Sequence, residues 1–298
     1  MFGITILGNN SALPAHGRHP TSQIITIADQ LLMLDCGEGT QFRIRDFRVK
    51  RSKINHIFIS HLHGDHYFGL IGLLSSMSLL GRTQDLHLFS PAPLQQIIAQ
   101  QTANNKLSFQ INFHPLEGNE LILEEEKFTV SSFRVIHKIE CFGFLIKEKH
   151  KPRKVNADAA LQAGIPPEDF EELQLGEDYV LPNGSIISNE SVTFTGKENK
   201  SYAYCADTLY TETFLPFIKN ANLIYHESTY LNDLTEQAKE RFHSTAAQAA
   251  TIALKANAKR LLLGHFSSKY KELDEFETQA KEIFPNTEIS CEGVTYIV

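Results

Sequence analysis

The chain has 298 residues, enough for one large domain or two small ones around a sizeable hydrophobic core. Its composition, with 42% hydrophobic and 21% charged residues, is that of an ordinary soluble globular protein, and no apolar run is long enough to predict a transmembrane helix. The formal net charge of −7 argues against indiscriminate binding to phosphate backbones, although a local basic patch is compatible with it.

The N-terminal region predicts the beginning of a β-sheet. Residues 1–8 lack a basic leader and indicate a first strand rather than a signal peptide. Two apolar runs, 24–27 and 31–34, predict a hairpin that closes on the Gly-rich stretch 35–40. That stretch predicts a tight turn, and a helix over 41–47 is expected to follow it.

A dense cluster of metal-type side chains follows the next strand. Residues 57–60 predict a buried strand, and a buried helix is predicted to begin at 67. Between them lies His61-Leu62-His63-Gly64-Asp65-His66. Three imidazoles and a carboxylate this close together are difficult to explain by packing, and they suit a borderline cation such as zinc. One loop cannot complete two tetrahedral sites, so further ligands must come from other parts of the chain.

The middle of the chain predicts more strands before its character changes. Strands are predicted at 86–89, 109–113, 128–136 and 141–147, with a helix at 91–104. From about 150 to 200 strong apolar periodicity is missing, and a basic cluster is followed by acidic residues. This region is therefore predicted to be an insertion or arm outside the core.

The C-terminal part alternates strands and helices again. Strands are predicted at 201–206, 223–225, 260–264 and 294–298, and helices at 244–258, capped by Ser244 or Thr245, and at 272–284. Helices outside mixed sheets, with polar residues where strands end, favour an α/β or α+β sandwich.

Four polar residues stand at the ends of predicted strands: His137, Asp207, His226 and His265. Two metals need about three protein ligands each and a bridge. Asp207 can bridge because a carboxylate has two oxygens, which leaves His137 and His265 as terminal ligands.

These motifs resemble the metallo-β-lactamase superfamily, in which His-x-His-x-Asp-His is followed by single His, Asp and His residues. More narrowly, the chain is similar over nearly its whole length to the ribonuclease Z family of tRNA 3′-processing endonucleases. The similarity rests on LDCGEGTQ at 34–41, SHLHGDH at 60–66 with FGL at 68–70, ADT at 206–208, HEST at 226–229 and HSTA at 243–246.

The resemblance implies a single metallo-β-lactamase domain over residues 1–298, an αββα sandwich of two mixed β-sheets flanked by helices, with a substrate-binding arm inserted at about 150–200. It implies two zinc ions per subunit, with Mn²⁺ or another divalent metal as the alternative. The seven implied ligands are His61, His63 and His137 for one ion, Asp65, His66 and His265 for the other, and Asp207 as the bridge.

The same resemblance implies that Asp65, Glu227 and His243 are catalytic. Asp65 would orient the attacking hydroxide, and Glu227 and His243 would relay a proton to the leaving 3′-oxygen. The enzyme would be a cytoplasmic homodimer, without membrane association, that removes the 3′ trailer of precursor tRNA and leaves a 3′-hydroxyl. His226 is interpreted as support for a ligand, and the alternative role of His243 is a cap on the Ala-rich helix.

Two regions depart from the family pattern. The family's arm carries a Gly-Pro motif with basic residues, whereas this chain reads PPEDF at 166–170 and continues with more acidic residues. The basic cluster at 147–154, from which Lys151, Arg153 and Lys154 are predicted to bind substrate, can compensate or can be a solvated stalk. Near the start, Arg18 is predicted to contact a phosphate.

Two alternatives remain open at this point. A di-zinc phosphodiesterase for smaller substrates, such as cyclic nucleotides or oligonucleotides, would use the same ligands. A metal-stabilised RNA-binding scaffold without turnover is the alternative outside the enzymes, and seven intact candidate ligands argue against it. The cysteines, Cys36, Cys141, Cys205 and Cys291, are far apart and predict buried free thiols in a reducing cytoplasm.

Overall fold

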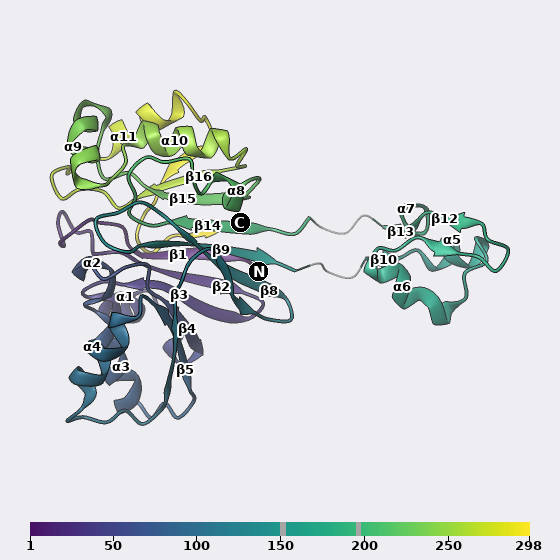
Figure 1. Ribbon diagram of the computed structural model, residues 1–298, viewed down its shortest axis with the longest axis horizontal. Helices are drawn as coiled ribbons and strands as arrows, with labels where there is room; N and C mark the ends of the chain where they lie inside the picture. The colour runs from purple at the N-terminus through teal and green to yellow at the C-terminus, as the bar shows by residue number, and fades with distance from the viewer. Residues whose placement is uncertain (150–152, 195–197) are drawn as a thin grey trace. The chain divides into compact units, whose positions relative to one another are not determined.

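The computed structural model describes residues 1–149, 153–194 and 198–298 (Figure 1). The chain divides into two compact units, a larger one of Met1–Lys147 with Lys200–Val298 and a smaller one of Glu148–Asn199. Within the described ranges, no helix has both the length and the apolar character needed to cross a membrane. The larger unit contains two β-sheets that pack face to face.

The first sheet combines strands from both ends of the chain. Its order is β18-β1-β2-β3-β4-β5-β6, in which β1 to β3 are antiparallel and β3 to β6 are parallel. The bounds are Gly3–Gly8 (β1), Ser22–Ile27 (β2), Gln30–Cys36 (β3), Ile54–Phe58 (β4), Leu86–Ser90 (β5), Ile111–Pro115 (β6) and Thr295–Ile297 (β18).

The predicted hairpin is confirmed as β2 and β3. It turns through Ala28 and Asp29, whose φ angles of 48° and 65° are both positive. Two positive φ angles are what a two-residue type I′ turn requires, and that turn matches the twist of the strands it joins. The hairpin thereby sets the register of β3, the strand that ends at Asp35 and Cys36.

The second sheet has the order β17-β16-β15-β14-β9-β8-β7. Strands β14 to β17 are parallel, whereas β9 is antiparallel to β14 and β7 is antiparallel to β8. The bounds are Glu120–Glu124 (β7), Phe128–Arg134 (β8), Phe142–Glu148 (β9), Ser201–Cys205 (β14), Leu223–Glu227 (β15), Leu261–Gly264 (β16) and Thr287–Ile289 (β17). Strands β7 and β17 were not predicted from the sequence.

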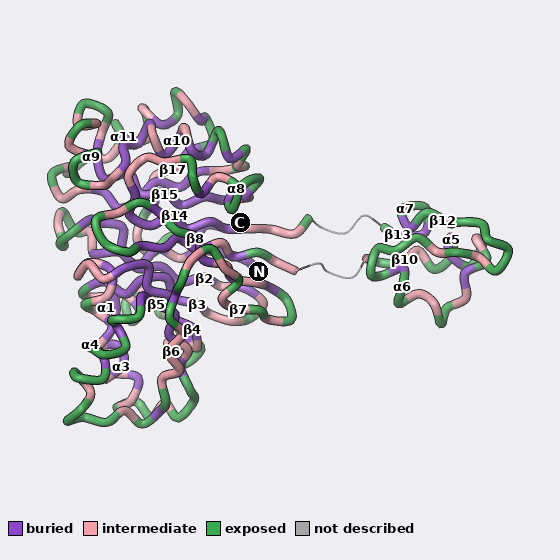
Figure 2. The backbone as a smooth tube through the Cα atoms, viewed as in Figure 1, coloured by how far each residue is buried: buried purple, intermediate pink, exposed green. Residues whose placement is uncertain are grey.

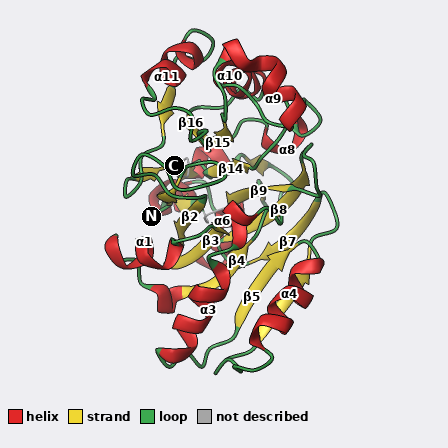
Figure 3. Ribbon diagram, turned by 90° about the vertical axis from the view of Figure 1, so that its left-hand side faces the viewer, coloured by secondary structure: helices red, strands yellow, loops and turns green. Residues whose placement is uncertain are grey.

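Helices cover the outer faces of both sheets, which confirms the predicted αββα sandwich (Figure 3). On the side of the first sheet lie α1 (Thr40–Asp46), α2 (Gly64–Tyr67), α3 (Leu70–Leu79) and α4 (Pro93–Thr102); on the side of the second lie α8 (Leu215–Ile218), α9 (Thr235–Arg241), α10 (Ala246–Lys255) and α11 (Asp274–Lys281). Short 3-10 turns occur at Arg51–Lys53 (η1) and Asn232–Leu234 (η3).

The expected cap of the Ala-rich helix is Thr245 rather than Ser244. Its hydroxyl accepts a hydrogen bond from the backbone N–H of Gln248, and the Gln248 side chain accepts one from the backbone of Thr245. This reciprocal capping box satisfies two donors that the first turn of α10 would otherwise leave unpaired. The buried Ala-rich face of α10 then lies close against β15 and β16.

Two apolar layers hold the larger unit together. Between the sheets, Phe58, Phe144 and Tyr204 are buried in one large cluster, and Leu73 on α3 belongs to a second cluster that joins the first sheet to its helices. Figure 2 shows the buried strands running through the centre of this unit. Each large apolar side chain removed from water contributes about 1.5–3 kcal/mol, so the two layers supply the rigid frame behind the strand ends.

The smaller unit has a core of its own. Four residues, Ala160, Ile165, Leu173 and Val192, form its buried cluster. Its elements are β10 (Lys154–Val155), α5 (Ala157–Gln162), η2 (Pro167–Asp169), α6 (Phe170–Leu175), β11 (Tyr179–Val180), β12 (Ile186–Ile187), α7 (Asn189–Val192) and β13 (Thr193–Phe194). So small a core explains why the sequence shows little apolar periodicity here.

Three sequence expectations are corrected. Strand β4 ends at Phe58, before the predicted 60, because the backbone N–H of Ser60 donates to the Asp35 carboxylate. The helix predicted from 67 is two helices, α2 and then α3. Cys291 is exposed, whereas Cys36, Cys141 and Cys205 are buried free thiols as predicted.

A histidine on β4 makes the fold sensitive to acid. His56 is 8% exposed, and its ring stacks on that of His87 on β5, 5.2 Å away between centroids. Burial and the neighbouring His87 lower the pKa of His56 to about 4 from its usual 6.5. Below pH 6.5 the unfolded chain therefore binds a proton that the folded chain does not, and stability falls as pH falls.

We expect His56 to contribute a loss of about 2 kcal/mol in the free energy of unfolding between about pH 7 and pH 5. Urea unfolding at both pH values measures it. His56→Gln, which cannot titrate, should show a smaller loss than the unmodified chain. Equal losses in both proteins would contradict this assignment.

Candidate metal centre and active site

All seven predicted ligands lie beyond the ends of strands and converge. The parallel strands of each sheet bring their carboxyl ends to one edge, which is where α/β folds place their sites. His61, His63, Asp65 and His66 follow β4, and the others are His137 after β8, Asp207 after β14 and His265 after β16. They form two groups, each able to hold a metal ion, that share Asp207.

The first group consists of three imidazoles and the shared carboxylate. His63 Nδ1 lies 3.1 Å from His61 Nε2 and 3.0 Å from His137 Nε2. Asp207 Oδ2 lies 3.6 Å from His61 Nε2 and 3.9 Å from His137 Nε2. Three ring nitrogens facing one another with a carboxylate beside them form the donor set of a zinc-type site.

The second group joins Asp65, His66 and His265 to the other side of Asp207. His265 Nε2 lies 3.2 Å from Asp207 Oδ1 and 3.3 Å from Asp65 Oδ2. His66 Nε2 lies 3.4 Å from Asp207 Oδ2 and 3.3 Å from His265 Nε2. The arrangement allows Asp207 to serve both groups, as the sequence predicts for a bridging ligand.

The outward-facing nitrogens of four of these histidines are each held by a partner. The contacts of Nδ1 are Ser60 Oγ for His61 at 3.0 Å, Asp35 Oδ2 for His66 at 2.8 Å, the Phe242 carbonyl for His137 at 2.9 Å and Thr229 Oγ1 for His265 at 2.9 Å. Such contacts fix the tautomer and direct Nε2 inward, as in metal-bound histidines. The residues present therefore fit a divalent metal pair.

The charges in the second group also fit a cation. Burial opposes a charge on His66, but Asp207, Asp65 and Asp35 raise the pKa of His66 well above its usual value. Burial alone would likewise raise the pKa of Asp207, yet His265 and His66 hold it well below the ordinary range. Three carboxylates around one buried imidazole require positive charge at this place, and a metal ion can supply it.

Asp35 is a site residue that the sequence motif contained without a role being assigned to it. Its fully buried carboxylate accepts hydrogen bonds from Ser60 N–H and Oγ, at 2.7 and 2.8 Å, and from Tyr204 Oη at 2.6 Å, and it contacts His66 Nδ1. Its φ of 55° is unusual for a residue other than glycine. A buried carboxylate that ends a strand in such a conformation is a signal that could have identified it.

Glycine permits the close approach of the two loops that carry this site. A Cβ on Gly37 would lie 2.4 Å from the carbonyl oxygen of Asp65, and one on Gly69 would lie 2.1 Å from the carbonyl oxygen of Gly37. The turn after β3 and the metal loop after β4 therefore touch through backbone atoms. Side chains larger than hydrogen at these two positions would push the Asp65 loop away from the centre.

Glu227 and His243 form a buried pair beside the second group. The Glu227 carboxylate lies 2.9 Å from His243 Nδ1 through Oε1. Burial alone would lower the pKa of His243, but the Glu227 carboxylate raises it to about 9. Burial likewise opposes the charge on Glu227, yet His243 lowers its pKa. His243 is therefore an imidazolium at neutral pH, paired with an ionised Glu227.

The Glu227 carboxylate is also saturated with donors. Besides His243 it accepts from the backbone N–H groups of Thr208, Ser244 and Thr229 and from the Thr229 hydroxyl, at 2.8–3.1 Å. A carboxylate with so many donors has a fixed position and little tendency to take up a proton. The Glu227 carboxylate therefore holds His243 Nδ1 in a fixed position.

His226, next in sequence to Glu227, does not join either ligand group. Its Nδ1 lies 2.6 Å from the backbone carbonyl of Glu227, and its ring faces Phe214. Its Nε2 is buried without a hydrogen-bond partner among the described residues. Burial lowers the pKa of His226, so the ring is neutral. The contacts of His226 in the described residues do not show the expected support of a ligand, since Nδ1 contacts the Glu227 carbonyl.

A cavity of about 420 Å³ opens onto these groups. Its lining includes His63, Asp65, Asp207 and His243, together with Ser11, Ala12, Pro20, Glu38, Gly64 and Phe68. Metal ligands and the charged imidazole thus face the same space. A substrate in this cavity can reach both groups at once.

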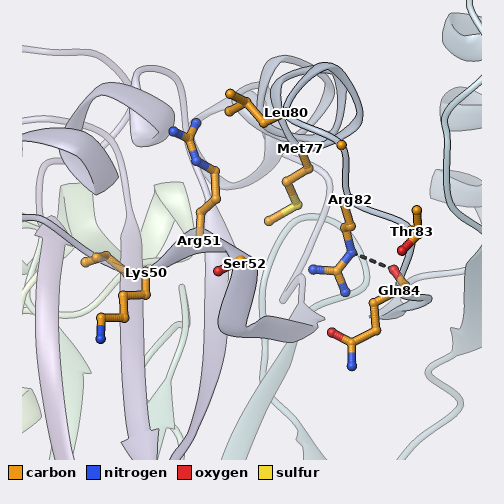
Figure 4. Close-up of a pocket in the computed structure, with 10 residues that line it drawn as sticks. Lys50, Arg51, Ser52, Met77, Leu80, Arg82, Thr83 and Gln84 are labelled. Atoms are coloured by element: carbon orange, nitrogen blue, oxygen red, sulfur yellow. Dashed lines mark hydrogen bonds between the residues drawn. The ribbon is translucent and has the colours of Figure 1, made fainter.

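A second cavity, of about 520 Å³, lies at the opposite ends of the strands (Figure 4). Residues 49–52, which lead into β4, line it together with Met77, Leu80 and Arg82 from the end of α3 and the loop after it. The Arg82 guanidinium donates to the backbone carbonyls of Gln84 and Ile54. This cavity contains none of the candidate ligands, so the chemistry belongs to the smaller one.

The predicted phosphate contact Arg18 is engaged within the chain. Its guanidinium donates to Asn10 Oδ1 at 2.9 Å and to the carbonyl of Lys271 at 3.0 Å, and it also donates to the carbonyl of Tyr270. These bonds tie the loop after β1 to the loop after β16. The structure thus gives Arg18 an anchoring role, and phosphate contact by Arg18 stays a prediction.

The other predicted substrate contacts belong to the smaller unit. Arg153 Nε donates to Thr193 Oγ1 at 2.8 Å. Lys154 is exposed, and its Nζ lies 6.0 Å from the centre of the Phe194 ring. Lys151 lies outside the described residues.

Known proteins resemble this chain in both sequence and fold. The family model described as Anti-Pycsar protein Apyc1 matches residues 2–163, a stretch that includes the metal loop and His137 but not Asp207, Glu227, His243 or His265. Ribonuclease Z from Bacteroides thetaiotaomicron is 40% identical over 98% of this chain and 94% of its own length. Ribonuclease Z from Parabacteroides distasonis is 40% identical over 98% of both chains.

Solved structures agree on the fold. Human tRNase Z, short form, has a TM-score of 0.71 at 24% identity and covers 98% of both chains. A metallo-β-lactamase fold protein from Bacillus subtilis has a TM-score of 0.71 at 21% identity, covering 99% of this chain and 98% of its own. The similarity to each of the two bacterial relatives extends over 98% of this chain, whereas the family model ends at residue 163, before Asp207, Glu227, His243 and His265. The chain therefore belongs to the ribonuclease Z family, of metallo-β-lactamase fold, and its residues 2–163 belong with the family described as Anti-Pycsar protein Apyc1.

Proposed function

We propose that this chain is a two-zinc endoribonuclease that removes the 3′ trailer of precursor tRNA and leaves a 3′-hydroxyl on the tRNA. As a member of its family it is a hydrolase that cleaves RNA. The main support for a two-metal mechanism in this chain is the pair of ligand groups that share Asp207. A charged His243 borders the same cavity.

In this proposal His61, His63 and His137 would hold one ion and Asp65, His66 and His265 the other, and Asp207 would serve both groups. Imidazole-rich sites with carboxylates suit zinc, whereas Mn²⁺ or another divalent ion is the alternative. When bound, such a pair lowers the pKa of an attacking water and neutralises charge on the phosphodiester. The chain's contribution is to fix the ligands before the substrate arrives.

Asp65 would orient the attacking water in this mechanism. Its Oδ2 accepts a hydrogen bond from the backbone N–H of Ala12 at 2.7 Å, which fixes the carboxylate at the wall of the cavity. A carboxylate held in this way can accept a hydrogen bond from the water and direct its lone pair toward phosphorus. The new P–O bond places the 5′-phosphate on the trailer.

His243 completes the reaction on the leaving side. As the bond between phosphorus and the tRNA 3′-oxygen breaks, that oxygen needs a proton to become the 3′-hydroxyl. Glu227 holds Nδ1 of His243 and keeps the ring protonated at neutral pH. His243 can therefore act as general acid, and such an acid accelerates a reaction about 10²–10⁴-fold.

The first test is cleavage of a precursor tRNA with a 3′ trailer by zinc-loaded protein, beside hydrolysis of bis(p-nitrophenyl) phosphate. We expect the trailer to be removed just after the discriminator base. Hydrolysis of the small phosphodiester without trailer removal would overturn the proposed RNA substrate but would still support the proposed metal centre.

Asp65→Ala is expected to abolish cleavage in the same assay, because it removes both a ligand and the group that orients water. Metal analysis should show that the variant binds one of the two ions more weakly, and circular dichroism should show that the fold is retained. Glu38→Ala is the matched control, since Glu38 is an exposed acid that lines the same cavity outside the ligand groups. Full activity of Asp65→Ala would contradict the assignment of Asp65 as a metal ligand and catalytic residue.

His243→Ala is expected to lower the cleavage rate of RNA about 10²–10⁴-fold while both ions remain bound. The same variant should hydrolyse a p-nitrophenyl phosphodiester at close to the normal rate, because p-nitrophenolate leaves without a proton. Loss of metal from this variant would show that His243 acts as a ligand, and equal losses on both substrates would count against a general acid.

The smaller unit, Glu148–Asn199, is proposed to be a substrate-binding arm that contacts tRNA phosphates through Lys151, Arg153 and Lys154. The exposed Lys154 beside the Phe194 ring supports this. Lys154→Gln should raise KM for precursor tRNA with kcat unchanged and lower the salt dependence of binding by about one ion. An unchanged salt slope would indicate a solvated stalk.

A homodimer is proposed as the active assembly. Two consecutive leucines at the end of α3, Leu79 and Leu80, are 85% and 64% exposed, and Leu80 lines the larger cavity (Figure 4). Exposed neighbouring leucines favour burial against a second copy. Light scattering should give twice the chain mass of 33.6 kDa, and Leu79→Lys with Leu80→Lys should reduce it to one chain mass. A monomeric parent protein would contradict this.

A cytoplasmic location is proposed from the thiols. Cys36, Cys141 and Cys205 are buried and unpaired, as expected in a reducing compartment. Fractionation of cells that express the chain tests this, and recovery outside the cytoplasmic fraction would refute it.

A further inference from the structure

Thr229 lies between the metal groups and the proton donor. It is 2% exposed, and it follows Glu227 by two residues, just beyond the end of β15. Its hydroxyl oxygen lies 2.9 Å from Nδ1 of the metal-group residue His265 and 2.8 Å from Glu227 Oε2. It also lies 3.3 Å from His243 Nδ1. One buried hydroxyl thus touches a candidate ligand and both members of the acid pair.

Hydrogen-bond chemistry assigns the protons in this network. If Nε2 of His265 is the atom that faces the metal, as proposed, its lone pair is used there, so Nδ1 carries the hydrogen and donates to the Thr229 oxygen. A hydroxyl has one hydrogen to give, and Glu227 Oε2 is the acceptor within reach. The other oxygen, Oε1, accepts from His243 Nδ1. The chain of donors runs from His265 through Thr229 to Glu227, and from His243 to the same carboxylate.

We propose that Thr229 is a positioning residue that couples the second metal group to the general acid. Its hydroxyl holds His265 in the ligand tautomer and at the same time holds Glu227 where that carboxylate keeps His243 in place. The inference rests on the proposed roles of His265 and His243. It adds that removal of a single hydroxyl weakens metal binding and proton donation together.

The backbone of Thr229 has contacts that its side chain does not affect. Its N–H donates to Glu227 Oε2 at 2.9 Å, and its carbonyl accepts from the Ser267 N–H at 3.2 Å. Thr229→Val keeps the branched shape and these backbone bonds while it removes the hydroxyl. It leaves the His265 N–H buried without its acceptor, which carries the cost of an unsatisfied donor. Thr229→Ser keeps the hydroxyl and loses only a methyl group.

Zinc affinity provides the decisive measurement, because it does not depend on turnover. Metal-free protein is titrated with zinc against a chromophoric chelator, for the parent chain, Thr229→Val and Thr229→Ser. Ser228→Ala is the matched control, since Ser228 is a neighbouring buried hydroxyl that donates to the Gly264 carbonyl at 3.1 Å and contacts no ligand side chain in the described residues. Thr229→Ala replaces the valine variant if that one does not fold.

We expect Thr229→Val to bind one of the two zinc ions about 10–100-fold more weakly and the other normally. Thr229→Ser and Ser228→Ala should bind both ions like the parent. At saturating zinc, the valine variant should also lose more activity on precursor tRNA than on a p-nitrophenyl phosphodiester, with Thr229→Ser restoring the difference.

Parent-like affinity for both ions in Thr229→Val, or the same loss in Ser228→Ala, would overturn the inference and leave the proposed function intact. If the parent chain binds two zinc ions but does not cleave precursor tRNA, the proposed RNA substrate is wrong. The difference in zinc affinity between the parent and Thr229→Val would still support the coupling. Equal losses on both phosphodiesters would overturn the link to the general acid.

Discussion

The carboxylate of Asp207 is the group on which the rest of the site depends. It is almost completely buried, and it lies within 3.9 Å of ring nitrogens of four histidines from three different loops. A buried charge is costly unless it is paired and hydrogen-bonded, so Asp207 is stable only where those imidazoles, and the cations they can hold, surround it. This requirement explains why the two sheets present their strand ends to one point.

Around this centre the chain provides a second layer of groups whose function is to orient the first. Asp35 holds His66 and the start of the metal loop, the Phe242 carbonyl holds His137, and Thr229 holds His265. Each of these partners is supplied by a strand end or a tight turn of the rigid frame. Preorganisation of this kind lets ligands meet a metal without a large entropic cost at the moment of binding.

The different roles proposed for Glu227 and His243 follow from the hydrogen bonds that each of them makes. Glu227 receives donors from four residues and stays ionised, whereas His243 has one nitrogen committed to Glu227 and borders the cavity. The alternative, purely structural role for His243 would be to cap α10, but the residue that caps this helix is Thr245. The His243 imidazole is thus not needed to cap the helix, and its raised pKa suits a proton donor to an alkoxide.

The sequence by itself determined the fold class and predicted a set of candidate ligands, because both depend on local patterns. The hairpin, most strands and the Ala-rich helix follow from short apolar runs and turn residues. The six residues from His61 to His66 predict a metal-binding loop by their residue types alone. The short strands β7 and β17 escaped prediction, since their residues carry little periodicity and their pairing partners decide them.

Tertiary structure alone decided which distant groups touch. Asp35 and His66 are 31 positions apart, and Thr229 and His265 are 36 apart, so no local pattern could show that one orients the other. The same holds for Arg18, whose donors go to carbonyls more than 250 positions away, and for the exposure of Cys291. Residue type specifies what a side chain can bond to, but only the packed strands specify which partner is within 3 Å.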